Sequence, residues 1–161
     1  MNNEQKLGAL YGYIVADALA LPFRYCERGT FKCGGMVGYG TFNQPQGTYS
    51  HDTALMLAAY DSLKVCGGHL YEDDLFLRCR WALERGKYFI DNNVFDFDHE
   101  LKNVLETGKR TDQDIPLLLG LALPFWVLGP IDTRPALDCL TSNVEPYLEG
   151  ETFKRDLSKM V

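Results

Sequence analysis

The residues best suited to chemistry are Ser50, His51 and Asp52, which place a hydroxyl, an imidazole and a carboxylate side by side. The preceding stretch predicts a loop that runs into the start of a helix. Free N–H groups and the positive end of the helix dipole favour anionic ligands there. Oxygens of Ser50 and Asp52 suit a hard cation such as Mg²⁺. The alternative is helix capping by Ser50 or Asp52. The residue types favour capping, which is compatible with ligand binding.

Asp17 is a second carboxylate of interest, because its sequence neighbours Val15, Ala16, Ala18 and Leu19 are apolar. A carboxylate in such a setting needs hydrogen-bonding partners. We expect Asp17 to tie the following loop through backbone N–H groups, in preference to a direct catalytic role.

An acidic segment covers residues 91–114, where seven carboxylates face three basic side chains. Such a segment usually forms a solvated face. Alternatively, Asp96, Asp98 and Glu100 form a contact surface for a basic patch on a protein partner, since charge complementarity speeds encounter and rejects wrong partners. His99 is expected at an acidic helix start, with a His–carboxylate metal site as the alternative, and His69 in a surface loop.

Helical periodicity positions these residues. Apolar residues at helical spacing predict one helix that ends before Pro22. They predict three more, from about Asp52 to Gly67, from about Tyr71 to Glu84, and from about His99 to Glu106. A further helix is expected from Asp114, with shorter ones at 134–141 and 151–159. Residues 26–49 hold six glycines and predict a long ordered loop, a type that is usually functional. Strand-like alternation is scarce, so the predicted fold is all-α, with residues 1–161 as one domain.

Composition narrows the classes of function. The chain has 161 residues, a net charge of −6 and a pI near 5.0, which argue against general affinity for nucleic acid or for anionic lipid. The apolar run 115–128 is shorter than the roughly 20 residues of a membrane span. Five cysteines without a C-x-x-C pair indicate free thiols in a reducing compartment, and the expected location is the cytoplasm.

An ordered series of motifs between residues 7 and 108 resembles the ADP-ribosylglycohydrolase family. Residues 8–12 and 16–22 are similar to the family's opening, G-A-x-x-G followed by G-D-A-L-G-A-P. Residues 38–55 are similar to the G-x-G-T-x-N-Q-P-x-G-T-W-S-D-D-T segment of a bacterial branch. Tyr71, Asp74, Trp81, Gly86 and Val94–Asp96 follow in the order of that branch.

The resemblance implies a compact orthogonal helical bundle and hydrolysis of ADP-ribosyl bonds with two Mg²⁺ ions, which orient ribose hydroxyls and activate a water. It places Ser50 and Asp52 as metal ligands and Asp52 as the catalytic carboxylate. Asp17, Ser50, His51 and Asp96 become candidates for binding an ADP-ribose-type ligand.

Several family positions are changed. His51 replaces an aspartate ligand, and imidazole suits softer metals than Mg²⁺. Arg24 stands where an acidic residue is expected, with Glu27 nearby as a substitute if the loop shifts. The G-N-G-S-L-M-R stretch falls on the apolar residues 115–121, and Thr141-Ser142 replaces a T-H pair. The C-terminal D-x-D-T ligands are expected beyond position 161, so the fold is expected to lack the C-terminal portion.

Two hypotheses follow. In the favoured one, the chain keeps the scaffold without its catalysis and binds a protein partner or an ADP-ribose-type ligand, for example as an inhibitor of a host factor. In the alternative, the chain is a short active ADP-ribosylglycohydrolase that uses Mg²⁺, with missing ligands supplied by another subunit of a homo-oligomer. No cofactor is expected under the first hypothesis.

Overall fold

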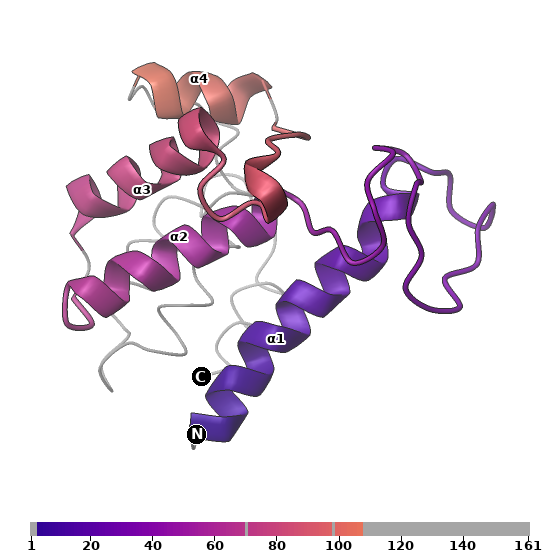
Figure 1. Cartoon of the computed structure of the whole chain (residues 1–161), viewed down its shortest axis with the longest axis horizontal. Coiled ribbons are helices and arrows are strands. Elements are labelled where there is room, and N and C mark those ends of the chain that lie inside the picture. Colours follow the sequence, from indigo (N-terminus) through magenta and orange to yellow (C-terminus); the bar gives the residue numbers. More distant parts are fainter. Residues whose placement is uncertain (1–2, 70, 98, 108–161) are drawn as a thin grey trace, which may run out of the picture.

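The computed structural model describes residues 3–69, 71–97 and 99–107, and these contain helices and loops without a strand (Figure 1). The prediction of an all-α protein is confirmed for this part of the chain. The helices expected after residue 108 lie outside the described residues. The elements in chain order are α1 (Asn3–Ala20), η1 (Leu21–Phe23), α2 (His51–Val65), α3 (Glu72–Arg85), η2 (Ile90–Asn92) and α4 (His99–Thr107).

Helix α1 packs on α2 through one apolar stripe. Leu10 is buried beside Met56 of α2, and Ile14 packs against the same cluster. Helical spacing also predicts Leu7 and Tyr11 on the face of Leu10 and Ile14, and this is wrong, because the two residues are 47% and 64% exposed. Both follow the four-residue spacing of a neighbouring stripe that points to solvent, and a stripe one position off cannot be told apart by spacing alone.

The main core lies between α2, α3 and α4. Its buried members include Leu55, Ala58, Ala59 and Leu63, the apolar stripe that helical spacing predicts for α2. Cys79 and Ala82 of α3 and Leu105 of α4 close the core from the other side. Burial raises the pKa of the Cys79 thiol to about 12, so this cysteine is an inert core residue.

Glycines end the helices where the sequence predicted. The last turn of α2 is followed by Gly67 and Gly68, both at positive φ, and the Gly68 N–H donates to the Leu63 carbonyl. Gly86 follows α3 in the left-handed conformation, and a Cβ at this position would collide with the Asn92 backbone. The chain therefore turns sharply after α3 and brings residues 88–97 back towards the start of α2.

A buried arginine ties α3 to α2. The Arg78 side chain is 9% exposed; its Nε donates to Asp74 Oδ2 at 2.6 Å, and its guanidinium also pairs with Asp61. The Ser62 hydroxyl donates to Asp74 at 2.6 Å, and the Tyr88 hydroxyl donates to Asp61 at 2.7 Å. The hydrogen bond from Arg78 holds the pKa of Asp74 below its usual range. Burial acts to raise the pKa of Asp61, but the Tyr88 hydroxyl and the Arg78 charge lower it overall.

Replacing Arg78 with leucine is expected to lower the free energy of unfolding by about 2 kcal/mol at neutral pH. The loss is moderate because Asp61 and Asp74 are about a third exposed and stay hydrated. Both carboxyls have a lower pKa in the folded than in the unfolded chain. Their contribution is therefore present above the unfolded value of about 3.9 and is lost as the pH falls through the folded values.

Urea unfolding between neutral pH and about pH 3 should show the gap between wild type and Arg78→Leu closing as the solution becomes acidic. Arg80→Leu is the matched control, because Arg80 is 44% exposed and makes only a surface pair with Glu84. That variant should stay within about 0.5 kcal/mol of wild type. A gap of constant size at every pH would contradict the assigned role of the two carboxyls.

Among the described residues, no helix combines the length and the apolar character needed to cross a membrane. Four of the five cysteines lie in this part of the chain, and all four are free thiols.

Candidate functional site

Ser50 caps the start of α2, as the residue types suggested. Its Oγ accepts a hydrogen bond from the Asp52 backbone N–H at 3.1 Å, and its backbone is extended, as is usual for an N-cap. The side chain is fully buried. The predicted loop and helix start are both confirmed, and the capping role leaves Asp52 in the first helical turn, where the helix dipole favours its negative charge.

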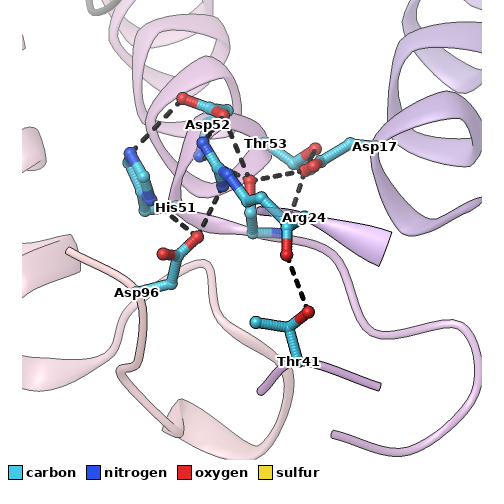
Figure 2. A network of polar contacts seen from close by, with 8 residues as sticks. Asp17, Arg24, Thr41, His51, Asp52, Thr53 and Asp96 are labelled. Carbon is cyan, nitrogen blue, oxygen red and sulfur yellow. Dashed lines mark hydrogen bonds and ion pairs between the residues drawn. The ribbon is translucent and has the colours of Figure 1, made fainter. Parts of the chain in front are cut away.

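Asp17 binds this helix start from α1, and the expectation that it ties the loop through backbone N–H groups is confirmed for one such group, while its other two donors are hydroxyls. A single oxygen, Asp17 Oδ2, accepts from the Ser50 backbone N–H at 2.9 Å and from the hydroxyls of Ser50 at 3.0 Å and Thr53 at 2.6 Å (Figure 2). The Ser50 hydroxyl also lies 3.3 Å from Asp52 Oδ2, but it has one proton and Asp17 is the nearer acceptor. Asp17 thus joins α1 to α2 at the centre of the site.

Arg24 lies between two carboxylates of the site. One guanidinium nitrogen donates to Asp52 Oδ2 at 3.0 Å, and another donates to Asp96 Oδ2 (Figure 2). The Asp96 side chain is only 5% exposed, whereas those of Arg24 and Asp52 are 29% exposed. The two carboxylates raise the pKa of Arg24 despite its partial burial, so its charge is permanent. A fixed cation therefore occupies the side of the site where Asp52 and Asp96 meet.

His51 is buried against the same two carboxylates. Its Nε2 lies 3.4 Å from Asp52 Oδ1, and its ring is tilted against Phe97 with centroids 5.3 Å apart. Its Nδ1 lies 3.5 Å from Asp96 Oδ2, yet the geometry there is not that of a hydrogen bond, and Nδ1 has no hydrogen-bonding partner in the described structure. His51 thus lies beside two of the carboxylates Asp17, Asp52 and Asp96, which together we call the carboxylate cluster, without contributing a carboxylate oxygen.

Contacts of Gly40 and Thr41 with Pro22 and Arg24 hold these two parts of the chain together. The Thr41 N–H donates to the Pro22 carbonyl at 3.0 Å, and the Thr41 hydroxyl donates to the Arg24 carbonyl at 2.7 Å. Gly40 lies so close to Pro22 that a Cβ would collide with its carbonyl. These contacts fix the backbone from which Arg24 extends towards α2.

The 88–97 loop is held in a similar way from the other side. The Tyr49 hydroxyl donates to the Tyr88 carbonyl at 2.6 Å, and the Asn93 amide donates to Gln44 at 3.0 Å. Asp96 itself has a φ of 59°, a conformation that aspartate tolerates better than most residues. The loop therefore delivers Asp96 into the site as a defined position.

Two further site residues were not singled out from the sequence. Thr53 completes the Asp17 bonds, and Tyr13 lies close enough to Asp52 and Asp17 to sense their charges. Burial, followed by the charges of Asp52 and Asp17, raises the pKa of Tyr13 to about 12, although Arg24 opposes the shift. The spacing held a signal for Tyr13, because residues four apart on a helix share a face and Tyr13 precedes Asp17 by four.

Of the proposed acidic contact surface, only the Asp96 side chain lies among the described residues. Asp96 was named both as a ligand-binding residue and as a partner contact; its buried position fits the first role and contradicts the second. The reason is its ion pair with Arg24, which draws the side chain inwards. Asp98 and the Glu100 side chain lie outside the described residues. Glu27 is exposed and does not enter the site, His99 begins α4 as expected, and His69 is exposed as expected.

The described residues do not fit a pair of magnesium ions. Asp17 is engaged by three donors, Asp52 and Asp96 are bonded to Arg24, and Ser50 is buried as a cap. In the described ranges, no group of three or more histidine, cysteine, aspartate or glutamate side chains has the arrangement of a metal site. The counterparts at 115–121 and 141–142 lie outside the described residues. Arg24 offsets one of the three negative charges of Asp17, Asp52 and Asp96 and donates to two of these carboxylates, so the site is held together by its own side chains.

No family model, curated protein or solved structure matches this chain.

Proposed function

We propose that this chain is a non-catalytic binding protein built on an ADP-ribosylglycohydrolase-like scaffold. Its site no longer assembles a metal centre, and it acts through contact with a partner, foremost a protein. The observation that carries the proposal is the pairing of Arg24 with both Asp52 and Asp96. The free thiols of the described cysteines are in keeping with action in a reducing compartment such as the cytoplasm.

The charge of Arg24 is decisive for metal binding. A divalent cation on Asp52 Oδ2 would lie beside a guanidinium that already donates to that oxygen at 3.0 Å. At a separation of about 4 Å and an effective dielectric constant of about 20, repulsion between charges of +1 and +2 is on the order of 8 kcal/mol. Metal binding therefore requires the Arg24 side chain to move away, which would leave the buried Asp96 carboxylate without its cation.

The histidine at position 51 also disfavours the binding of a divalent cation. An aspartate there would add an anionic oxygen to the cluster, and His51 adds a ring that packs on Phe97 instead. Imidazole is a poorer ligand for Mg²⁺ than carboxylate. Two of the positions that the resemblance assigns to anionic oxygens thus hold basic side chains, which makes the site less negative than the family pattern would.

Titration calorimetry with Mg²⁺ and Mn²⁺ tests this proposal. We expect no binding to the wild-type protein at millimolar metal. The double variant Arg24→Glu with His51→Asp should gain Mn²⁺ binding, because it replaces two basic side chains with carboxylates. Arg28→Glu with Lys32→Glu is the matched control for added negative charge, since both side chains are exposed and outside the cluster.

Incubation with an ADP-ribosylated protein and Mn²⁺ tests the alternative of a short active hydrolase. Release of ADP-ribose by the wild-type chain that is abolished by Asp52→Ala would overturn the proposal. The expected result is no release above that of the Asp52→Ala control. Calorimetry with free ADP-ribose, run on the same samples, shows separately whether the scaffold retains a small-molecule ligand.

A further inference from the structure

The loop between η1 and α2, residues 24–49, carries the most exposed aromatic side chains of the described chain, and we call it the tyrosine loop. In Figure 1 it projects beyond the C-terminal end of α1 and away from α3 and α4. Tyr25 and Tyr39 are 80% and 71% exposed, the highest values among the large apolar side chains of the described chain. Phe31 and Val37 of the same loop are also exposed. Tyrosine is enriched at binding hot spots because it offers a large contact area with few rotatable bonds.

Both tyrosines are held in an unusual backbone conformation. Tyr25 has a φ of 67° and Tyr39 a φ of 59°, a region that bulky side chains rarely adopt. Such strain persists only where the surroundings determine the conformation, and it is concentrated at functional positions. A glycine in either place would relieve it, so stability alone does not account for an exposed tyrosine at both.

The surroundings of Tyr39 make its position rigid. It stands between Gly38 and Gly40, whose backbones lie too close to Gln46 and Pro22 to accept a Cβ. Its own N–H donates to the Gln44 carbonyl at 2.7 Å. The segment cannot relax by shifting towards its neighbours, and the phenol is presented to solvent from a fixed base.

Tyr25 is attached to the same framework. Its ring packs edge-on against Phe42 with centroids 6.0 Å apart, and the preceding carbonyl, of Arg24, accepts the Thr41 hydroxyl. The segments that carry the two tyrosines are therefore linked through Thr41. Since Arg24 is anchored in the carboxylate cluster, the cluster also holds this part of the loop in place.

The charge of the loop is opposite to that of the whole chain. Residues 24–49 contain three cations, Arg24, Arg28 and Lys32, and one anion, Glu27, but Arg24 is paired with Asp52 and Asp96, so the exposed side chains Arg28, Lys32 and Glu27 carry +1 in a chain of net charge −6. Arg28 and Lys32 are exposed. Guanidinium, ammonium and phenol groups are all hydrogen-bond donors, and carboxylate is the acceptor that a guanidinium binds in a bidentate manner.

We propose that the tyrosine loop is the docking surface of this protein and that its partner presents an acidic segment of polypeptide. The two phenols and the apolar side chains supply contact area, and Arg28 with Lys32 selects carboxylates. A basic, aromatic surface also suits single-stranded nucleic acid, but the net charge of −6 opposes a polyanion of that charge density. This inference rests on the proposed binding function and names the class of its partner.

Fluorescence polarisation with the full chain tests the proposal. The probes are a short labelled peptide that alternates glutamate with apolar residues, its glutamine and lysine counterparts, and a single-stranded oligothymidylate of matched length. The glutamate peptide should bind best, and its binding should weaken as salt is raised. Tyr39→Gly, and separately Arg28→Glu with Lys32→Glu, should each weaken it by roughly tenfold or more.

Two control variants change similar groups elsewhere. Tyr11→Ala removes an exposed tyrosine of α1, and Lys64→Glu reverses an exposed charge of α2, so both should bind the glutamate peptide as wild type does. Tyr39→Gly should unfold at the same or a higher temperature than wild type, because glycine adopts positive φ without strain. A loss of binding in that variant therefore reflects the missing ring.

Equal binding of all peptides, preference for the lysine peptide or the oligonucleotide, or unchanged binding by the loop variants would each overturn the proposal. These outcomes are separate from a failure of the proposed function. A chain that hydrolyses an ADP-ribosyl bond and still selects the glutamate peptide through Tyr39 would refute the loss of catalysis alone.

Discussion

Replacing Asp17 with alanine is expected to lower the free energy of unfolding by about 4 kcal/mol, the largest effect of any single substitution in the site. One carboxylate oxygen accepts from the Ser50 backbone N–H and from two hydroxyls, and both Ser50 and Thr53 are completely buried. The Ser50 hydroxyl can turn to Asp52, but the Ser50 N–H and the Thr53 hydroxyl would be left without an acceptor. Each buried unsatisfied group costs about 1–3 kcal/mol.

Urea denaturation measures this loss, and Asp17→Asn is the matched control. An asparagine carbonyl keeps an acceptor near the two donors and removes only the charge, so its cost should be about half that of alanine or less. Glu4→Ala changes an exposed carboxylate at the other end of the same helix and should have almost no effect. Equal losses for alanine and asparagine would show that the hydrogen bonds are not the source of the stability.

Replacing Arg24 with alanine is expected to cost about 3 kcal/mol, because it leaves the buried Asp96 carboxylate without its cation. His51 remains nearby, but its Nδ1 makes no hydrogen bond to Asp96. The loss should be visible as a lower urea midpoint at neutral pH. Arg28→Ala, which removes an exposed arginine of the same loop, should stay within about 0.5 kcal/mol of wild type.

A double-mutant cycle separates the ion pair from the packing of Arg24. Asp96→Ala introduced into the Arg24→Ala protein removes the unpaired charge and should restore stability or leave it unchanged. If Asp96→Ala costs as much in the Arg24→Ala background as in wild type, the two side chains are not coupled. The structural basis proposed for the loss of metal binding would then be refuted.

The sequence predicted those parts of the site that depend on local rules. Ser50 could be placed as a cap because capping uses a hydroxyl directly before a helix and an N–H two residues later. Asp17 could be assigned to a backbone tie because an apolar helix face leaves a carboxylate few other partners. The ends of α2 and α3 followed from Gly67 and Gly86, whose conformation is specific to glycine.

The rest of the site depends on contacts between distant segments. Arg24 and Asp96 are 72 positions apart, and nothing in their residue types predicts that they pair. The sequence showed Arg24 only as a departure from a family pattern, and it named Asp96 both as a ligand-binding candidate and as part of an acidic contact surface. Their pairing is determined by Gly40 against Pro22 on one side and by Tyr49 on Tyr88 on the other. The positive φ of Tyr25 and Tyr39 is equally a result of loop closure, which residue type would have argued against.

The separation between Arg24 and Asp96 also has a consequence for the order of folding. Helices α2 and α3 are neighbours in sequence and bury their apolar stripes against each other, so they can form early. The bridge from Arg24 to Asp96 has to close a long loop and is expected to form after the folding barrier. Substitutions at Arg24 should then leave the refolding rate nearly unchanged and accelerate unfolding, by roughly a hundredfold for a loss of about 3 kcal/mol. The bridge from Arg24 to Asp96 would then determine the unfolding rate, and with it the lifetime of the native chain.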